Sequence, residues 1–319
     1  MSQTGKPRPY RVGFYLVPQF PMLAFAAALE PLRAANRLSG RVLYAWTLVS
    51  RDGRPVRASN GIDVPVQHAI GDAAPVDLML ACAGTHDPKA AAPAVAKWLR
   101  ALSRSGASLG GISLGAYVLA DAGLLDGRSC AVHWENLAAF AERYPRVRTT
   151  PDIFAIDGQR YTCSGGTAAL DIMLHVIRER DGRALASAVS EQFIHPRIRD
   201  TRDSQRMAVQ TRIGAANPKL IAAVELMESG EETRSVQAIA QAVGLSPRQL
   251  ERLFAQRLRE SPSRYYMRAR LARARSMLLQ TARPILDVAV ASGFATASHF
   301  SRCYRAAYGR RPSDERSVH

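Results

Sequence analysis

The serine in the segment 111-GISLG-115 is the residue whose setting most clearly suggests covalent chemistry. The pattern G-x-S-x-G places a serine on a sharp turn between a strand and a helix, where its hydroxyl can act as a nucleophile. Such a serine needs a histidine base and a carboxylate that orients the base. His133 follows Ser113 by only twenty residues, and Glu135 comes after it, whereas hydrolases of this type place the acid before a distant histidine. This spacing disfavours catalysis by Ser113. A serine hydrolase or amidase that uses Ser113 stays open as the alternative function.

Alternating strands and helices between residues 10 and 195 must position this serine. The apolar runs predict strands at 11–17, 42–50, 76–82, 129–134, 153–156 and 161–163, and helices at 22–35, 91–103 and 167–179. This alternation favours an α/β fold with a doubly wound, mostly parallel sheet of the flavodoxin-like kind.

Loops that follow three of the predicted strands carry the candidate binding residues. Ligands of such sheets bind outside the carboxyl ends of the strands, where neighbouring loops converge. Three groups of residues lie at the ends of predicted strands: Gly84, then Ser113 with Leu114, and then His133 with Trp134. Glycine lets the chain turn sharply and lets backbone N–H groups approach a ligand, and the face of Trp134 can receive a cationic amine. We therefore expect a pocket for a small molecule at this edge.

The stretch 112-ISLGAYVLADAGLLDGRSCAVHWE-135 resembles the elbow region of the PfpI-type, glutamine amidotransferase-like superfamily. The resemblance implies a cysteine nucleophile at the elbow, but this chain has Ser113 there, followed by Leu114 in place of a small polar residue. A thiolate is a nucleophile at neutral pH, whereas a hydroxyl requires a strong base. The resemblance therefore implies that residues 10–195 form an effector-sensing domain without catalytic activity, cofactor or metal.

Glu30 is the acidic residue that the resemblance places opposite the elbow. Its carboxylate would pair with a cationic effector, and a helix-surface carboxylate near Arg33 is the equally open alternative. The predicted effector site consists of Glu30, Gly84, Ser113, Leu114, His133 and Trp134.

Residues 217–319 have helical periodicity only. Apolar residues recur at helical spacing over 236–243, and Gly244 ends that predicted helix. Ser246 and Pro247 then supply an N-cap and a proline at the first helical position, which together predict the start of a second helix. This is the pattern of a helix-turn-helix unit.

The same unit recurs about fifty residues later. Ile285, Val288, Ala289 and Gly293 match Val236, Ile239, Ala240 and Gly244 at an offset of 49, and Phe300, Arg302 and Tyr304 match Leu250, Arg252 and Phe254 at an offset of 50. Residues 263–279 between the units are long enough for a rigid connecting helix. Such a helix can hold two recognition helices about 34 Å apart, so that both enter the major groove of one duplex.

The charge of the 319-residue chain supports contact with phosphates. The net charge is +16, and residues 234–319 hold 16 Lys and Arg against five Asp and Glu. This concentration is typical of a surface that binds nucleic acid, although a basic helical bundle that binds no DNA stays open. The four cysteines, Cys82, Cys130, Cys163 and Cys303, show no metal-ligand spacing.

The stretch 285-ILDVAVASGFATASHFSRCYRAAYGRRPSDER-316 resembles the DNA-binding domain of AraC/XylS regulators. The resemblance implies that outward-facing residues of the second helix of each unit face DNA. The predicted DNA-binding residues are Arg248, Gln249, Glu251, Arg252, Ser298, His299 and Arg302. Ala297 stands where a polar reader is common in the family.

From end to end the chain resembles the GlxA-type transcription regulators, in stretches such as 29-LEPLRAANRLSG-40 and 162-TCSGGTAALDIML-174. The resemblance implies an activator that responds to an amine or amino acid such as glycine betaine, carnitine or arginine. It implies a homodimer that binds promoter DNA, an effector and RNA polymerase, with residues 196–216 as the linker. The sequence shows no secretory signal and no long apolar span, so we expect a cytoplasmic protein without membrane contact. An architectural DNA binder that needs no effector is a further alternative.

Overall fold

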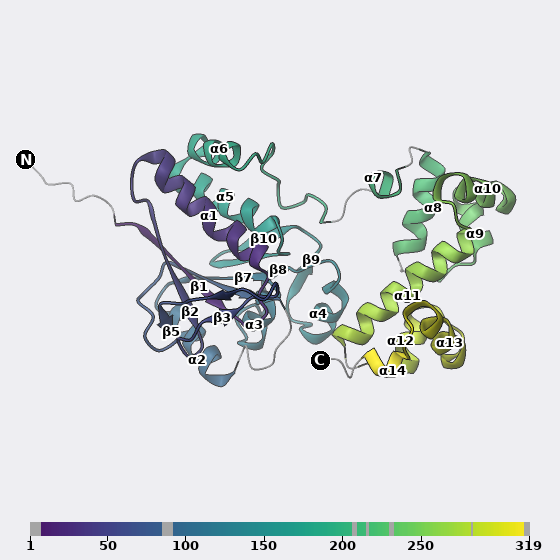
Figure 1. Ribbon diagram of the computed structural model, residues 1–319, viewed down its shortest axis with the longest axis horizontal. Helices are drawn as coiled ribbons and strands as arrows, with labels where there is room; N and C mark the ends of the chain where they lie inside the picture. Colours follow the sequence, from purple (N-terminus) through teal and green to yellow (C-terminus); the bar gives the residue numbers. More distant parts are fainter. Residues whose placement is uncertain are drawn as a thin grey trace, which may run out of the picture. The chain divides into compact units, whose positions relative to one another are not determined.

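The computed structural model describes residues 8–84, 92–205, 209–214, 217–229, 233–281 and 283–315. The chain divides into two compact units, Met1–Gln205 and Arg206–His319 (Figure 1). Each unit is described by itself. No helix among the described residues is both long and apolar enough to span a membrane.

The first unit is built on a seven-stranded sheet with the order β10-β11-β7-β6-β1-β2-β5. Its strands are β1 (Tyr10–Leu16), β2 (Tyr44–Ser50), β5 (His68–Ala69), β6 (Leu78–Ala83), β7 (Ser108–Ser113), β10 (Phe154–Asp157) and β11 (Arg160–Cys163). All neighbours pair in parallel except β10 and β11, which form an antiparallel edge. Every residue of the central strand β6 is buried, which explains its unbroken apolar sequence, because helices cover both faces of such sheets. The predicted mostly parallel α/β fold is confirmed.

Helices pack on both faces of this sheet. They are α1 (Met22–Ser39), α2 (Pro93–Arg104), α3 (Gly115–Asp121), α4 (Leu137–Arg143), α5 (Ala168–Asp181) and α6 (Arg183–Gln192). The first, fifth and sixth contact one another on one face, while α2 and α3 contact β7 on the other (Figure 1). Two small ladders complete the unit, β3 (Val56–Arg57) with β4 (Asp63–Val64), and β8 (Ser129–Ala131) with β9 (Arg148–Thr150).

The described residues of the second unit form helices and no strands, as predicted. Its helices are α7 (Val209–Ile213), α8 (Pro218–Ser229), α9 (Val236–Ala242), α10 (Pro247–Leu258), α11 (Pro262–Gln280), α12 (Ile285–Ala291), α13 (Ala297–Tyr308) and α14 (Pro312–Glu315). Two separate apolar cores form, one around α8 to α10 and one around α12 and α13. The long helix α11 contributes to both cores, so it is the connecting helix that the sequence predicts over 263–279.

The boundary between the units differs from the predicted linker. The sequence assigns 196–216 to a linker, but residues up to Gln205 belong to the first unit. Arg199 and Gln205 are the reason, because both form hydrogen bonds with the body of that unit. Residues 206–208 and 215–216 of the predicted linker lie outside the described residues.

Candidate effector pocket and nucleic-acid interface

Ser113 lies at the end of β7 in a left-handed backbone conformation, with φ of +56°. This conformation costs an L-residue about 1–2 kcal/mol, and strained residues of this kind cluster at functional sites. Gly115, the second glycine of the G-x-S-x-G pattern, is required by packing, because a Cβ there would lie 1.8 Å from the carbonyl oxygen of Ala81. Leu114 donates its backbone N–H to the carbonyl of Ala83 at 3.0 Å. The elbow is therefore held from the neighbouring strand.

Gly165 forms the wall of the elbow on the side of β11. Its φ is +94°, and a Cβ at this position would lie only 2.7 Å from the Cβ of Ser113. The backbone N–H groups of Gly165 and Ser113 lie near the thiol of Cys163 and act to lower its pKa. Burial raises the pKa of Cys163 to about 11, against the opposing effect of these two donors, so the thiol stays protonated at neutral pH. Gly165 and Cys163 are neighbours of the elbow that sequence reasoning missed.

Gly84 lies beside the elbow on the side of β6, and a role for it toward an effector stays a prediction. The preceding residue, Ala83, is the register partner of Ser113. A Cβ on Gly84 would lie 2.2 Å from the carbonyl oxygen of Gln19, so the loop after β1 packs directly against this glycine. Residues 85–91, which follow it, lie outside the described residues.

His133 and Trp134 follow β8 and remain partly accessible. Burial lowers the pKa of His133 below its ordinary value, while the Glu135 carboxylate, 3.6 Å from Nδ1, opposes that shift. The imidazole is therefore neutral at pH 7. The Trp134 side chain is 39% exposed, and its ring lies 5.5 Å from that of His133. The two rings offer an aromatic, uncharged surface.

Glu30 is engaged on the surface of α1. Its carboxylate accepts from Nε of Arg33 at 2.7 Å and from Nη2 at 2.6 Å, which is the alternative that the sequence left open. Among the described residues, no side chain forms a hydrogen bond with the Ser113 hydroxyl. This holds for Glu30 and for the described histidines. A role for Glu30 toward an effector stays a prediction.

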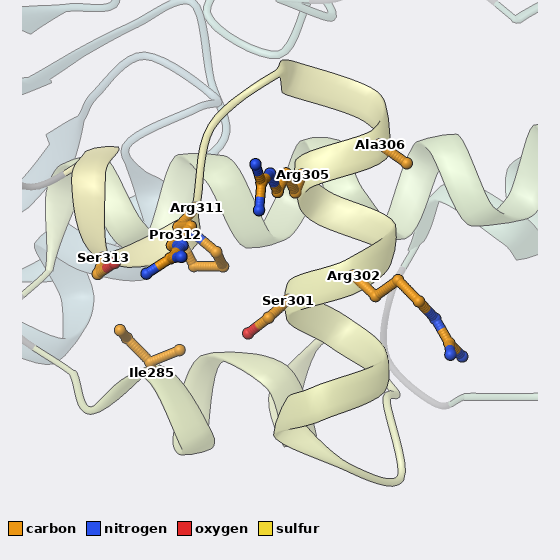
Figure 2. A pocket seen from close by; sticks show the side chains of 8 residues that line it. All are labelled: Ile285, Ser301, Arg302, Arg305, Ala306, Arg311, Pro312 and Ser313. Carbon is orange, nitrogen blue, oxygen red and sulfur yellow. The ribbon is translucent and has the colours of Figure 1, made fainter.

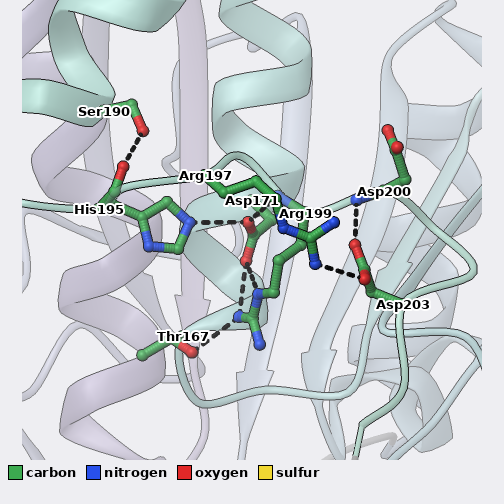
Figure 3. A network of polar contacts seen from close by, with 8 residues as sticks. All are labelled: Thr167, Asp171, Ser190, His195, Arg197, Arg199, Asp200 and Asp203. Atoms are coloured by element: carbon green, nitrogen blue, oxygen red, sulfur yellow. Dashed lines mark hydrogen bonds and ion pairs between the residues drawn. The ribbon is translucent and has the colours of Figure 1, made fainter.

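A buried carboxylate, Asp171, organises the end of the first unit (Figure 3). Its side chain is fully buried on α5 and accepts from Nε2 of His195 at 2.9 Å. Arg199 donates to it three times, from Nη2 at 2.7 Å, the backbone N–H at 2.8 Å and Nε at 3.0 Å. Arg199 also donates to Oγ1 of Thr167 at 2.8 Å, and Thr167 comes two residues after Gly165. We call residues 195–205 the exit strap, because they leave the first unit.

The last residue of the exit strap, Gln205, is bound to the loop of Trp134. Its Oε1 accepts from the backbone N–H of Trp134 at 2.7 Å. Its Nε2 lies within donating distance of three carbonyls, those of Asp152 at 2.7 Å, Val132 at 2.8 Å and Pro151 at 3.1 Å. The exit strap is thus joined both to the Gly165 side of the elbow and to the Trp134 loop. No sequence pattern marked this role.

The predicted DNA-binding residues of the first helix-turn-helix lie on the exposed face of α10. Arg248, Glu251 and Arg252 are exposed, while Leu250 beneath them is buried. Gln249 has a second role, because its Oε1 accepts from the Ser246 backbone N–H at 2.8 Å and completes a capping box. A base contact by Gln249 would therefore use its amide NH₂ group.

The corresponding residues of the second unit lie on α13. Ser298, His299 and Arg302 are exposed, and the ring of His299 packs against Phe294 with centroids 5.7 Å apart. Thr296 caps the helix by accepting from the His299 backbone N–H at 3.2 Å. The two helices thus present equivalent polar faces, as the duplication predicts.

A concave surface of about 650 Å³ adjoins α13 (Figure 2). It is lined by Ile285, Ser301, Arg302, Arg305, Ala306, Arg311, Pro312 and Ser313. Arg305 and Arg311 lie on the same side of α13, and Arg302 extends away from them (Figure 2). Within the described parts of the chain, no acidic side chain pairs with these three arginines, which leaves them available for phosphates. Arg305 and Arg311 were missed by the sequence analysis, although Arg305 follows Arg302 at helical spacing.

These two sites define a class of protein, a DNA-binding regulator whose helix-turn-helix units follow an α/β domain with a preserved elbow. Comparison with known families agrees with this class. The DJ-1/PfpI family matches residues 23–179, and the helix-turn-helix domain family matches residues 239–317.

Characterised relatives place the chain in a particular family. It is 45% identical to the HTH-type transcriptional regulator GbdR of Pseudomonas aeruginosa strain UCBPP-PA14, over 97% of this chain and 84% of that protein. It is also 45% identical to the regulator CdhR of strain PAO1, over 96% of this chain and 91% of that protein. The crystal structure of an AraC family transcriptional regulator from Pseudomonas putida covers 58% of this chain and 100% of its own, with 32% identity and a TM-score of 0.54. The chain belongs to the HTH-type transcriptional regulators of the AraC family that carry a DJ-1/PfpI domain, and it binds promoter DNA in that role.

Proposed function

We propose that this regulator activates catabolic genes when a small cationic amine or amino acid occupies a pocket at the Ser113 elbow. The observation that carries the proposal is the elbow itself, with Ser113 strained at φ +56° between Gly84 and Gly165. A strained backbone persists only where the surrounding structure enforces it. In this chain the position holds a hydroxyl that has no hydrogen-bonded base among the described side chains. This supports a pocket that binds a ligand without turning it over.

The chemistry of the neighbouring side chains favours a cation. Trp134 offers an exposed aromatic face, which attracts ammonium groups. His133 is neutral at pH 7, because burial lowers its pKa, so it does not repel a positive charge. Glu30 is the carboxylate that we propose as the partner of the effector, which requires it to exchange Arg33 for the ligand.

The exit strap supplies a route from the pocket to the DNA-binding unit. Arg199 is linked to the Gly165 side of the elbow by its hydrogen bond to Thr167, and Gln205 is linked to the Trp134 loop by its hydrogen bond with the Trp134 backbone. A ligand acts as a switch only if it binds one of two states of the protein more tightly than the other. An effector that binds more tightly to one arrangement of the Gly165 side or of the Trp134 loop would therefore change the position of the exit strap. The strap continues into α7 and the helix-turn-helix units. We propose that the protein acts as a homodimer that recruits RNA polymerase.

Isothermal titration with glycine betaine, carnitine and arginine tests the effector proposal. Trp134→Ala should weaken binding of the active amine at least tenfold, which corresponds to about 1.4 kcal/mol. Trp46→Ala is the matched control, because Trp46 is similarly exposed, at 37% against 39%, and lies on a different strand, β2. Equal affinities of the wild type and Trp134→Ala would remove Trp134 from the site, and equal affinities for Glu30→Gln would remove Glu30.

A serine hydrolase is the second candidate function, because Ser113 has the backbone conformation of a nucleophile elbow. A fluorophosphonate probe distinguishes the two functions. We expect no labelling of the full-length protein at Ser113. Labelling that disappears in Ser113→Ala would establish a reactive serine and contradict the proposed loss of catalysis.

A further inference from the structure

The two helix-turn-helix units have separate apolar cores, and α11 contributes side chains to both of them. Tyr265 and Tyr266 of this helix belong to the core of the first unit. Leu271, five residues after Tyr266, belongs to the core of the second. The residues of α11 between these two tyrosines and Leu271 therefore connect the two cores.

Arg270 lies at this point and binds the turn between α12 and α13. Its Nε donates to the carbonyl of Ser292 at 2.7 Å, and its Nη2 donates to the carbonyl of Gly293. The guanidinium lies over the ring of Phe294, 4.3 Å from the centroid, and 5.7 Å from that of Tyr266. One side chain of the connecting helix thus holds the turn that leads into the recognition helix of the second unit.

The first unit contacts the same turn from the other side. A Cβ on Gly293, whose φ is +79°, would lie 2.4 Å from Oγ1 and 2.6 Å from Cγ2 of Thr233. Thr233 lies three residues before α9, the first helix of the first unit. Its neighbour Arg234 donates its backbone N–H to the hydroxyl of Tyr266 at 3.3 Å. We call Thr233, Tyr266, Arg270 and Gly293 the joint.

We infer that Arg270, through this joint, fixes the angle between α10 and α13 and so determines the spacing of the two DNA half-sites that the protein accepts. Arg270 acts as a positioning residue, since its Nε and Nη2 groups donate to backbone carbonyls of the protein. One added base pair moves a half-site by about 3.4 Å along the duplex and rotates it by about 35°, because a turn contains about 10 base pairs. A rigid joint cannot follow this change without losing contacts in one groove. The inference rests on DNA binding and is independent of any effector.

Affinity for DNA duplexes of altered spacing tests the inference. The full-length wild type first selects a bipartite site from a random duplex pool, and duplexes are then made with one base pair added or removed between the halves, and with one half alone. The wild type should lose about tenfold or more in affinity on either spacing change. Arg270→Met, which keeps the aliphatic stem, should bind the single half-site like the wild type but differ by less than about threefold among the three spacings.

Arg268→Met is the matched control, because Arg268 lies on the same helix, is exposed and pairs with Glu260. It should keep the spacing preference of the wild type. An Arg270→Met protein with the full spacing preference of the wild type would overturn the inference. If Arg270→Met also binds the single half-site more weakly than the wild type, Thr233→Gly tests the inference instead. Thr233 is exposed, so Thr233→Gly should relax the spacing preference without unfolding the protein. An unchanged preference in Thr233→Gly would then overturn it. A wild type that selects no DNA would contradict DNA binding itself, which is a separate outcome.

Discussion

The substitution Asp171→Asn removes the charge at the centre of the exit-strap network and keeps the shape of the side chain. One oxygen of Asp171 accepts from Nε2 of His195 and from the backbone N–H of Arg199, and the other accepts from Nε and Nη2 of Arg199. An asparagine must direct its NH₂ group toward one of these pairs of donors. Two of the four hydrogen bonds are therefore lost, and the guanidinium of Arg199 loses its ion pair.

The expected cost follows from the burial of the two partners. Asp171 is fully buried, and Arg199 is 27% exposed. Breaking a buried ion pair costs about 3–5 kcal/mol, and we expect about 3 kcal/mol because Arg199 can turn partly toward solvent. For a unit of this size, 1 kcal/mol shifts the Tm by about 2–4 °C. The Tm of the first unit should therefore fall by about 6–12 °C.

Tryptophan fluorescence measures this change in the full-length protein, because all three tryptophans, Trp46, Trp98 and Trp134, lie in the first unit. Asp203→Asn is the matched control, since it removes the surface ion pair of Asp203 with Arg197, which is 66% exposed, and should cost less than about 1 kcal/mol. A Tm for Asp171→Asn within about 2 °C of the wild type, or an equal loss in Asp203→Asn, would refute the reasoning.

Three further predictions concern the elbow and the DNA interface. Burial lowers the pKa of His133, so the imidazole binds a proton more readily in the unfolded chain than in the folded one. The stability that neutral His133 contributes is therefore complete above about pH 6.5 and is lost as the pH falls below that value. His133→Gln should reduce the fall in Tm between pH 7.5 and pH 5.5. Gly165→Ala, which places a Cβ 2.7 Å from that of Ser113 at φ +94°, should destabilise the first unit by about 2 kcal/mol in urea denaturation. Arg302→Ala should weaken binding to the selected DNA by about 1–3 kcal/mol and relax its preference at one base, whereas Arg305→Ala should weaken all sequences equally and reduce the salt slope by about one.

The predictions for His133 and Gly165 have matched controls, and the prediction for Arg305 has a result that would contradict it. His68→Gln, a change at a half-buried histidine of β5, should give the same Tm profile as the wild type. Gly71→Ala should be tolerated, because nothing lies within 4 Å of a Cβ there. Identical salt slopes for Arg305→Ala and the wild type would exclude a phosphate contact at Arg305.

Much of the fold was predictable because its signals are local. The run 78–83 is apolar throughout and became a central strand, and the capping pattern at Ser246 and Pro247 marked the start of α10. The short strands β3 and β4 were missed, since two residues carry no periodicity. The helix α6 was missed because its apolar face is narrow, with Ala186, Val189 and Ser190 as its buried residues.

The parts of the sites that escaped prediction depend on contacts between distant residues. In the sequence, Arg199 is one of several arginines in a polar segment, and only the fold brings it to Asp171, 28 residues earlier. Gly165 is unremarkable in sequence, and its role follows from the backbone of Ser113 beside it. Arg270 resembles the other arginines of α11 in sequence, and only the fold brings it to the turn at Gly293.

Hydroxyl-radical footprinting on the selected duplex tests the central claim most directly, that two recognition helices of one chain occupy adjacent grooves. The wild type should protect two half-sites about one helical turn apart. Arg252→Ala should lose protection over one half-site and Arg302→Ala over the other. A single footprint that both variants weaken to the same extent, or a duplex left unprotected by the wild type, would contradict the account.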